Sequence, residues 1–271
     1  MKQFILNTEP DRDGIVRLED KDYKYLIRVR RLAAGECFPA LLPNGERTVV
    51  QIISADNGIL TGKCGFSGET TQKIENEKTI PPIILFQALP KGEKMDLIVR
   101  QAAECGISEI IPFESKFSIA KASSNERKLS RWDRIVKEAR QQSGSKTATV
   151  VKNPLTMSGL FECWEKMRSN TLRGNEVLGL LFHHLEIDRG TPLEHKSLHS
   201  YLNSIPTVAA LVIGPEGGFS ESEVSDFQEN GFKVITIGDT VLRTETAALF
   251  CAAAVRILLL ERNSWELKQP K

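Results

Sequence analysis

Two segments near the end of the chain constrain its fold more than any other feature. They read AALVIGPEGGFSESEV from residue 209 and KVITIGDTVLRTETAALFCAAAVRILLL from residue 233. Each is an apolar run that stops at a glycine turn and continues into a helical pattern, which predicts a strand, a tight turn and a helix. In an open parallel sheet such turns gather at the carboxyl ends of the strands, where ligands bind. The two turns are therefore expected to form one pocket.

The first of these turns has features that suit close contact with a ligand. Glycines at Gly214, Gly217 and Gly218 leave backbone amides uncovered. Ser220 is expected to cap the following helix, and Glu223, three residues later, completes the pattern of a capping box.

The second turn opens a polar loop at 239–246 that is rich in hydroxyl groups and contains one arginine, Arg243. The chain has no GxxxxGK followed by Ser or Thr, so a phosphate-binding P-loop is excluded. No GxGxxG follows a strand, which argues against a dinucleotide-binding fold and against the common methyltransferase fold with its early glycine fingerprint. We expect a pocket for a flat, polar ligand.

The chain has 271 residues, which suits one large or two modest domains. Residues 1–72 contain short apolar runs and the turn signals Asn44-Gly45 and Asn57-Gly58, which predict a small antiparallel barrel or sandwich. The runs lie at 4–6, 37–42, 49–53 and 59–64.

A polar stretch at 69–78 is interpreted as a linker to a second domain at 79–271. There the apolar runs alternate with helical patterns, and continuously apolar strands predict a parallel α/β sheet that is covered on both faces. Strands are expected at 83–88, 109–113, 148–151, 177–182 and 208–213, and helices at 93–105, 125–142 and 157–167.

The two signature turns, IGPEGGFS and GDTVLRTETAAL, closely resemble the C-terminal signature of the RsmE family of SPOUT methyltransferases. The resemblance covers nearly the whole chain, because LPKGEKMDLIVRQAAECGISEIIPF, RWDRIVKEARQQSG and YLIRVRRLAAGE are similar to other segments of that family. It implies an α/β-knot domain, a parallel sheet with a trefoil knot, after a PUA-like RNA-binding β-barrel. It also implies a homodimer that uses S-adenosylmethionine to methylate N3 of a uridine in 16S (small-subunit) rRNA, either free or assembled in the 30S subunit.

The cofactor is expected between the two turns and is expected to be read mainly by backbone groups. Phe182 and Leu242 supply apolar surface, and Thr244 and Thr246 either contact the ligand or cap the last helix. The expected cofactor-binding residues are Phe182, Gly214, Gly217, Ile237, Gly238, Leu242, Thr244 and Thr246.

Methylation of the weakly acidic uridine N3–H needs a base or a group that stabilises the deprotonated ring. Arg243 suits the second role, because a guanidinium stays charged and offers several donors to the uracil carbonyls. Glu216 is either the base or an acid that orients the cofactor. Both have structural alternatives, since Arg243 could simply pair with Glu245 and Glu216 could bond only to helix amides. No further ligand is spaced for a metal beside His183 and His184, so no metal is expected.

Basic residues concentrate between Lys21 and Arg31, beside tyrosines that can stack on unpaired bases. We expect RNA contact there, because unopposed charge in a short segment otherwise only repels itself. The expected RNA-binding residues are Lys24, Tyr25, Arg28, Arg30 and Arg31. A second basic set on the helix at 125–142 fits RNA contact about as well as a solvated face with i, i+4 ion pairs.

The last helix is apolar on all sides at 249–260 except for Arg256, so it is expected in a core or in the dimer interface. This run is too short to span a membrane. Five cysteines without a CxxC pair are read as reduced core residues. With a formal net charge of only +1, RNA must be met by local patches. A cytoplasmic protein without a membrane partner is expected.

The chain departs from the family pattern at Tyr25 in place of His, at Arg100-Gln101 in place of Gln-Lys, at Cys105 in place of Leu, and at Phe117 and Ser145, each in place of Arg. These positions are expected to face RNA, so they put the target base in doubt more than the cofactor. Two alternatives follow: a related SPOUT enzyme that acts on tRNA or on a ribose 2′-hydroxyl, and a non-catalytic RNA-binding paralogue. The intact LRTETA motif argues against the paralogue.

Overall fold

The computed structural model of the chain describes residues 3–65, 80–123, 125–170, 176–184, 197–236 and 240–266, with side chains to 261. The predicted linker at 69–78 lies outside the described residues. Contacts divide the chain into two units, of which the first comprises 1–77 with 137–148 and the second 78–136 with 149–271.

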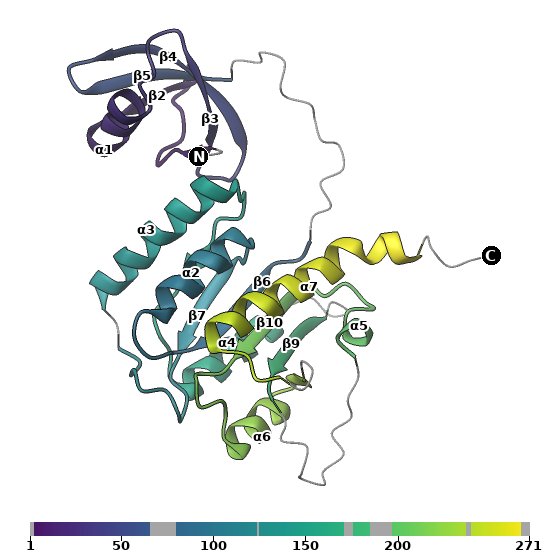
Figure 1. Cartoon of the computed structure of the whole chain (residues 1–271). Helices are drawn as coiled ribbons and strands as arrows, with labels where there is room; N and C mark the ends of the chain where they lie inside the picture. The colour runs from purple at the N-terminus through teal and green to yellow at the C-terminus, as the bar shows by residue number, and fades with distance from the viewer. Residues whose placement is uncertain are drawn as a thin grey trace. The chain divides into compact units, whose positions relative to one another are not determined.

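The first unit is built on a five-stranded sheet (Figure 1). Its strands are β1 (Phe4–Ile5), β2 (Ile15–Leu18), β3 (Cys37–Leu41), β4 (Arg47–Asp56) and β5 (Ile59–Cys64). Their order is β1-β3-β4-β5-β2. The antiparallel expectation needs one correction: β1 pairs with β3 in parallel, while the other neighbouring pairs are antiparallel.

A helical segment that the sequence did not predict follows β2. It consists of α1 (Asp20–Tyr23) and the π-helix η1 (Lys24–Val29), in which the amide of Arg30 donates to the carbonyl of Tyr25 over 2.9 Å. Leu26 is fully buried and anchors the segment in the core of the sheet. Leu26 is the one buried side chain among the described residues of this basic segment, so the sequence shows little helical periodicity and does not predict the helix.

The end of α3 (Glu126–Ser143) and the turn after it belong to the first unit. Lys137 Nζ donates to Asn7 Oδ1 over 2.8 Å. Gln3 Nε2 donates to the carbonyl of Arg140 over 3.4 Å. Residues 137–148 thus complete a unit whose other residues come from the start of the chain.

The second unit contains a six-stranded sheet in which every neighbouring pair is parallel, as the apolar strands predicted. The strands are β6 (Ile83–Ala88), β7 (Glu109–Phe113), β8 (Val150–Val151), β9 (Val177–Phe182), β10 (Val208–Ile213) and β11 (Lys233–Ile235). Their order is β11-β9-β10-β6-β7-β8, so β10 lies between β9 and β6.

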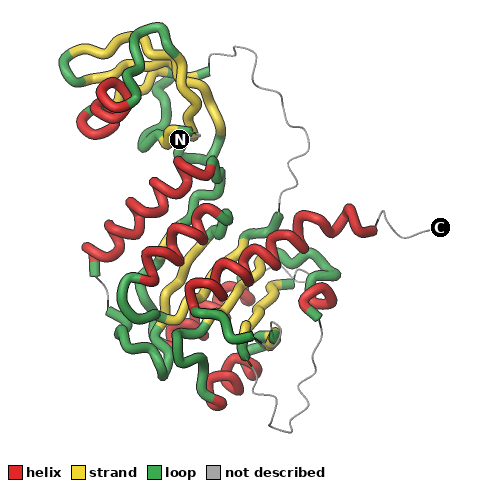
Figure 2. The backbone as a smooth tube through the Cα atoms, in the orientation of Figure 1, coloured by secondary structure: helices red, strands yellow, loops and turns green. Residues whose placement is uncertain are grey.

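Helices cover both faces of this sheet (Figures 1 and 2). The remaining helices are α2 (Lys94–Glu104), α4 (Met157–Ser169), α5 (Leu198–Tyr201), α6 (Glu221–Glu229) and α7 (Thr244–Glu266). α2 and α7 pack side by side on one face. On the other face, Trp164 of α4 and Phe227 of α6 join a buried aromatic cluster with Phe86 of β6.

Gly179 shows how tightly this cluster is packed. A Cβ on Gly179 would lie 2.6 Å from Cδ1 of Phe232 and 2.9 Å from Cζ2 of Trp164, so only glycine lets both rings rest on β9. Close packing of this kind fixes how Trp164 of α4 and Phe232 lie on β9. Among the described residues, no helix is long and apolar enough to cross a membrane.

Candidate functional site

The two signature segments meet at the carboxyl edge of the parallel sheet. Thr244, the first residue of α7, donates from Oγ1 to the carbonyl of Gly214 over 2.7 Å. The same hydroxyl accepts from Nε2 of Gln87 over 3.0 Å. Gln87 is fully buried on β6, and Gly214 directly follows β10. The hydroxyl of Thr244 therefore ties α7 to both central strands.

The first glycine turn packs closely against its neighbours at two of its glycines. A Cβ on Gly214 would approach Cε2 of Phe219 to 3.2 Å, and one on Gly217 would approach Cβ of Phe117 to 3.0 Å. Phe117 itself is 46% exposed, so an aromatic ring stands beside the glycine turn.

Glu216, in the same turn, is engaged by α2. Its Oε1 accepts from Nζ of Lys94 over 2.7 Å, and the Lys91 amide donates to both carboxylate oxygens over 3.2 and 3.3 Å. Lys94 also lies 3.6 Å from Glu245 on α7. Partial burial works to raise the pKa of Glu216, but the bonds from Lys94 and Lys91 outweigh it and hold that pKa below its ordinary value.

An ionised, ion-paired Glu216 is a weaker base than a free carboxylate. The hydrogen bond to Glu216 also raises the pKa of Lys94 above its ordinary value, so the pair stays charged at neutral pH. The three charged groups connect α2, the first turn and α7, and this arrangement favours orientation over proton transfer.

Glu223 anchors the helix after the turn and confirms the predicted capping box. The Ser220 amide donates to Glu223 Oε2 over 2.8 Å, and Ser220 Oγ accepts from the Glu223 amide over 3.4 Å. The other carboxylate oxygen of Glu223 accepts from the Lys116 amide over 2.8 Å. This buried carboxylate therefore holds the loop that presents Phe117.

The other predicted cofactor residues are distributed around this edge. Phe182 is buried at the end of β9, Leu242 is half-buried, and Arg243 and Thr246 are exposed. Ile237 and Gly238 lie outside the described residues. Arg243 directly precedes Thr244, so the bonds of Thr244 fix the position of its backbone.

Buried polar atoms without a hydrogen-bond partner among the described residues also gather here. Gln87 Oε1, Ser115 Oγ and Thr236 Oγ1 are such atoms, and each lies at or just after the end of β6, β7 or β11. Native proteins rarely leave buried polar groups unpaired, so these three atoms are open to hydrogen bonds from bound water or from a ligand.

His183 and His184 follow β9 at the same edge. Burial, and secondarily the neighbouring His184, lowers the pKa of His183 below its ordinary value. Within the described part of the chain, no three His, Cys, Asp or Glu side chains are placed to hold a metal ion.

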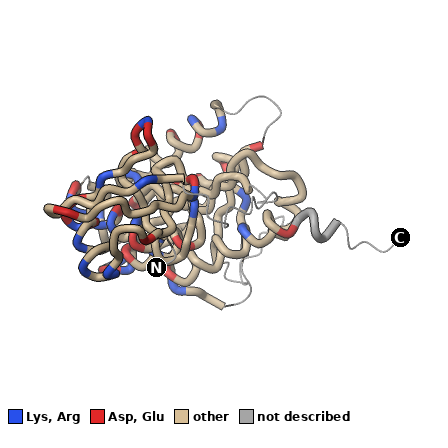
Figure 3. The backbone as a smooth tube through the Cα atoms, turned by 90° about the horizontal axis from the view of Figure 1, so that it is seen from above, with Lys and Arg blue, Asp and Glu red and all other residues tan. Residues whose placement is uncertain are grey.

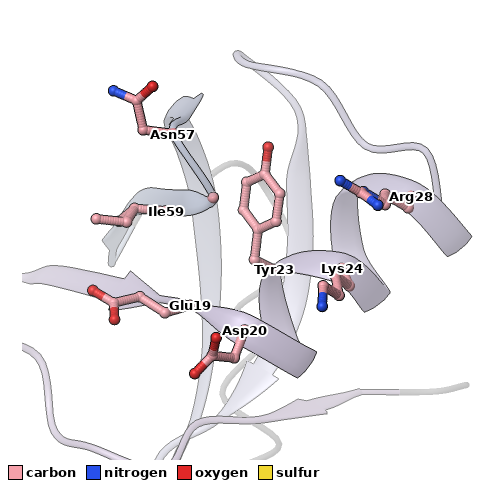
Figure 4. A pocket seen from close by; sticks show the side chains of 8 residues that line it. Glu19, Asp20, Tyr23, Lys24, Arg28, Asn57 and Ile59 are labelled. Atoms are coloured by element: carbon pink, nitrogen blue, oxygen red, sulfur yellow. The ribbon is translucent and has the colours of Figure 1, made fainter.

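The basic segment of the first unit borders a surface hollow (Figure 4). Lys24 and Arg28 line it, together with Tyr23. Tyr25, expected to contact RNA, has its ring stacked on Phe4 with centroids 6.4 Å apart, so much of it faces the core. Of the other two predicted residues, Arg31 is exposed and Arg30 is half-buried.

The basic residues of α3 serve structural roles more than the sequence suggested. Arg131 pairs with Asp96 of α2, and Lys137 lies 3.8 Å from Asp22. Arg140 is 9% exposed, and burial lowers its pKa. Figure 3 shows basic and acidic residues interspersed along the chain.

Sequence reasoning missed Gln87 and Lys94. A signal existed for Gln87, because one glutamine interrupts the apolar strand IILFQA, and a buried amide needs partners. Lys94 gave no local signal, since its partner Glu216 is 122 positions away in the sequence.

The chain is similar to known proteins in three comparisons: with a family profile, with individual protein sequences and with solved structures. The profile of the RNA methyltransferase domain family matches residues 76–256. The ribosomal RNA small subunit methyltransferase E of Synechocystis is 30% identical over 260 residues, covering 95% of this chain and 78% of that protein. A protein of Borreliella burgdorferi named ribosomal RNA small subunit methyltransferase E 2 is 29% identical, covering 97% and 100%.

Among solved structures, the ribosomal RNA small subunit methyltransferase E of Neisseria gonorrhoeae, bound to S-adenosyl methionine, superposes with a TM-score of 0.73. It is 26% identical and covers 95% of this chain and 98% of its own. The structure of a putative methyltransferase from Legionella pneumophila, 22% identical, has the same fold with a TM-score of 0.71.

Proposed function

The chain belongs to the ribosomal RNA small subunit methyltransferase E family, and we propose that it transfers a methyl group from S-adenosylmethionine to N3 of a uridine in small-subunit rRNA. One observation carries this proposal: Thr244 Oγ1 bonds to the carbonyl of Gly214 and so brings both signature turns to one edge of the sheet. Family membership alone would not place them together in this chain.

The residues at this edge fit the methyl donor. The glycine turn leaves backbone open where a Cβ would meet Phe219 or Phe117, and the orphaned hydroxyl of Thr236 directly precedes Ile237 and Gly238. When bound, S-adenosylmethionine supplies an activated methyl group. The groups proposed to hold it are the backbone of both turns and of Thr244, the apolar surface of Phe182 and Leu242, and the hydroxyl of Thr246.

Arg243 is the proposed catalytic residue. A uridine loses its N3 proton to solvent water before or during methylation, and negative charge then spreads onto the two ring carbonyls. A guanidinium that stays charged at all relevant pH values can donate to those oxygens. Glu216 is proposed as an orienting acid, because its ion pair with Lys94 holds the turn and lowers its basicity.

The finer architecture is part of the same proposal. We infer that residues 1–72 form a PUA-like barrel and that residues 79–271 form a SPOUT domain whose sheet is knotted. The position of β10 between β9 and β6 supports a chain that returns through the sheet.

A homodimer acting in the cytoplasm on free rRNA or on the 30S subunit completes the proposal. Phe250 and Ile257 of α7 are each 50% exposed in the single chain, and Leu97 of α2 is 38% exposed. Apolar side chains left exposed on two adjacent helices support a partner subunit on that face.

The test is a nucleoside analysis after incubation with methyl-labelled S-adenosylmethionine. Purified protein is given assembled small subunits that lack the modification, naked small-subunit rRNA and tRNA in separate reactions. We expect label in N3-methyluridine of small-subunit rRNA. Arg243→Ala should lower the rate by about a hundredfold or more, whereas Arg168→Ala, which removes a partly exposed cation from α4, should leave it unchanged.

Other products would contradict the proposed function and support one of the two alternatives. Label in tRNA or in a 2′-O-methyl ribose would identify a related SPOUT activity. Absence of label in every RNA, with S-adenosylmethionine bound, would favour the non-catalytic paralogue, for which Phe117 in place of an arginine is the structural argument.

A further inference from the structure

The hollow beside the basic segment is open to solvent and has a mixed lining (Figure 4). It measures about 320 Å³, at the lower end of the range of small-molecule pockets. Tyr23 stands in the middle, with Asn57 and Ile59 on one side and Lys24 and Arg28 on the other. Glu19 and Asp20 form the remaining wall.

The parts of this hollow are held in place by the fold. Tyr23 donates from its hydroxyl to the carbonyl of Ala55 over 3.4 Å, which fixes the ring upright. Asn57 and Gly58, with φ of 52° and 82°, form the tight turn between β4 and β5 and hold the Asn57 amide at the rim. Lys24 and Arg28 lie on the π-helix η1, a form of turn that is often found at functional sites.

Each side chain matches one part of a ribonucleotide. A tyrosine ring is a platform for base stacking, and an asparagine amide offers a donor and an acceptor to a base edge. Lys24 and Arg28 suit the phosphates. Glu19 and Asp20 can accept hydrogen bonds from ribose hydroxyls, of which the 2′-hydroxyl is present only in RNA.

The two carboxylates argue against a patch that only attracts the RNA backbone. Such a patch gains nothing from two acidic residues beside two basic ones, since their negative charge repels phosphate. We propose that the hollow captures one unstacked nucleotide of the substrate RNA and that Tyr23, Asn57 and the two carboxylates recognise its base and ribose. This inference rests on the proposed function only in taking RNA as the partner.

The test measures binding of the full-length protein to single-stranded oligouridylate RNA and to oligodeoxyuridylate of equal length. Tyr23→Leu should weaken RNA binding by about tenfold, while Tyr23→Phe, which loses only the hydrogen bond to Ala55, should stay within about twofold. Asn57→Gly keeps the turn, because glycine adopts the same φ, and should also weaken RNA binding.

Charge variants provide the control for general electrostatics. Lys24→Gln should weaken binding more than Lys63→Gln, which removes an exposed charge from β5 outside the hollow. Combining Glu19→Gln with Asp20→Asn should lower the ratio of RNA to DNA affinity, by about threefold or more, even though removal of negative charge strengthens binding of both.

The hollow proposal is overturned if Tyr23→Leu binds like Tyr23→Phe, if Asn57→Gly binds like the wild type, or if the RNA-to-DNA ratio is unchanged in the carboxylate variant. Methyl transfer to small subunits is measured on the same wild-type preparation. If the protein methylates small subunits but the hollow variants bind RNA like the wild type, only the hollow proposal is refuted. If the hollow variants weaken RNA binding as expected but the wild type does not methylate rRNA, only the proposed function is refuted.

Discussion

Replacing Thr244 with valine tests the bond on which the site is built. Valine has nearly the shape of threonine, so Thr244→Val removes the hydroxyl without opening a cavity. Two hydrogen bonds are lost, one to the Gly214 carbonyl and one from Gln87 Nε2. Both partners are buried or half-buried, and each unmade bond costs about 1–2 kcal/mol. We expect the free energy of unfolding to fall by about 2–4 kcal/mol.

The measurement is urea unfolding followed by tryptophan fluorescence, paired with calorimetric titration of S-adenosylmethionine. All three tryptophans, at positions 132, 164 and 265, lie in the second unit, so fluorescence follows that unit. A destabilisation of 2–4 kcal/mol corresponds to a melting temperature lower by about 5–15 °C. Cofactor affinity should fall as well, because both turns lose their shared anchor.

Two matched variants separate the site from general stability. Thr149→Val makes the same chemical change at a buried threonine whose Oγ1 donates to the Ile107 carbonyl over 2.6 Å. It should destabilise the second unit by about 1–2 kcal/mol and leave cofactor affinity unchanged. Thr244→Ser keeps the hydroxyl and should retain cofactor binding. The reasoning fails if Thr244→Val unfolds within about 0.5 kcal/mol of the wild type, or if Thr149→Val weakens cofactor binding equally.

Three further predictions concern packing, pH and assembly. Gly179→Ala should lower the free energy of unfolding by about 1–3 kcal/mol, because its Cβ overlaps Phe232; urea unfolding at wild-type stability would contradict this packing. Because the folded-state pKa of Glu216 is lowered, its stabilisation is present above the ordinary carboxyl pKa of about 4.3 and is lost as pH falls through the folded value. The difference in unfolding free energy between wild type and Glu216→Gln should thus persist at neutral pH and disappear in acid, and a difference that grows in acid would reverse the assigned sign. Phe250→Lys and Ile257→Lys should convert the proposed dimer to monomers in sedimentation, and a monomeric wild type would remove the basis for that interface.

Local patterns in the sequence predicted much of the second unit. The runs at 83–88, 109–113, 177–182 and 208–213 coincide with four strands to the residue, because strands covered on both faces are apolar throughout. The capping box at Ser220 followed from residues three positions apart. Such features depend on neighbours in the chain, and a sequence shows them directly.

Contacts between distant segments could not be predicted in the same way. Gln87 and Thr244 are 157 positions apart, and neither carries a local sign of its partner. The ion pair between Lys94 and Glu216 likewise exists only because the sheet brings α2 to the first turn. The surroundings of Tyr25 also depended on the fold, since its ring stacks on Phe4.

The most direct measurement is mass-spectrometric quantification of N3-methyluridine in small-subunit rRNA from a strain that lacks this gene. The strain is complemented with the wild type, with Arg243→Ala or with Arg168→Ala, at equal protein levels. We predict that the modified nucleoside is absent without the gene, is restored by the wild type and by Arg168→Ala, and is not restored by Arg243→Ala. Unchanged N3-methyluridine in the strain without the gene would contradict the proposed function.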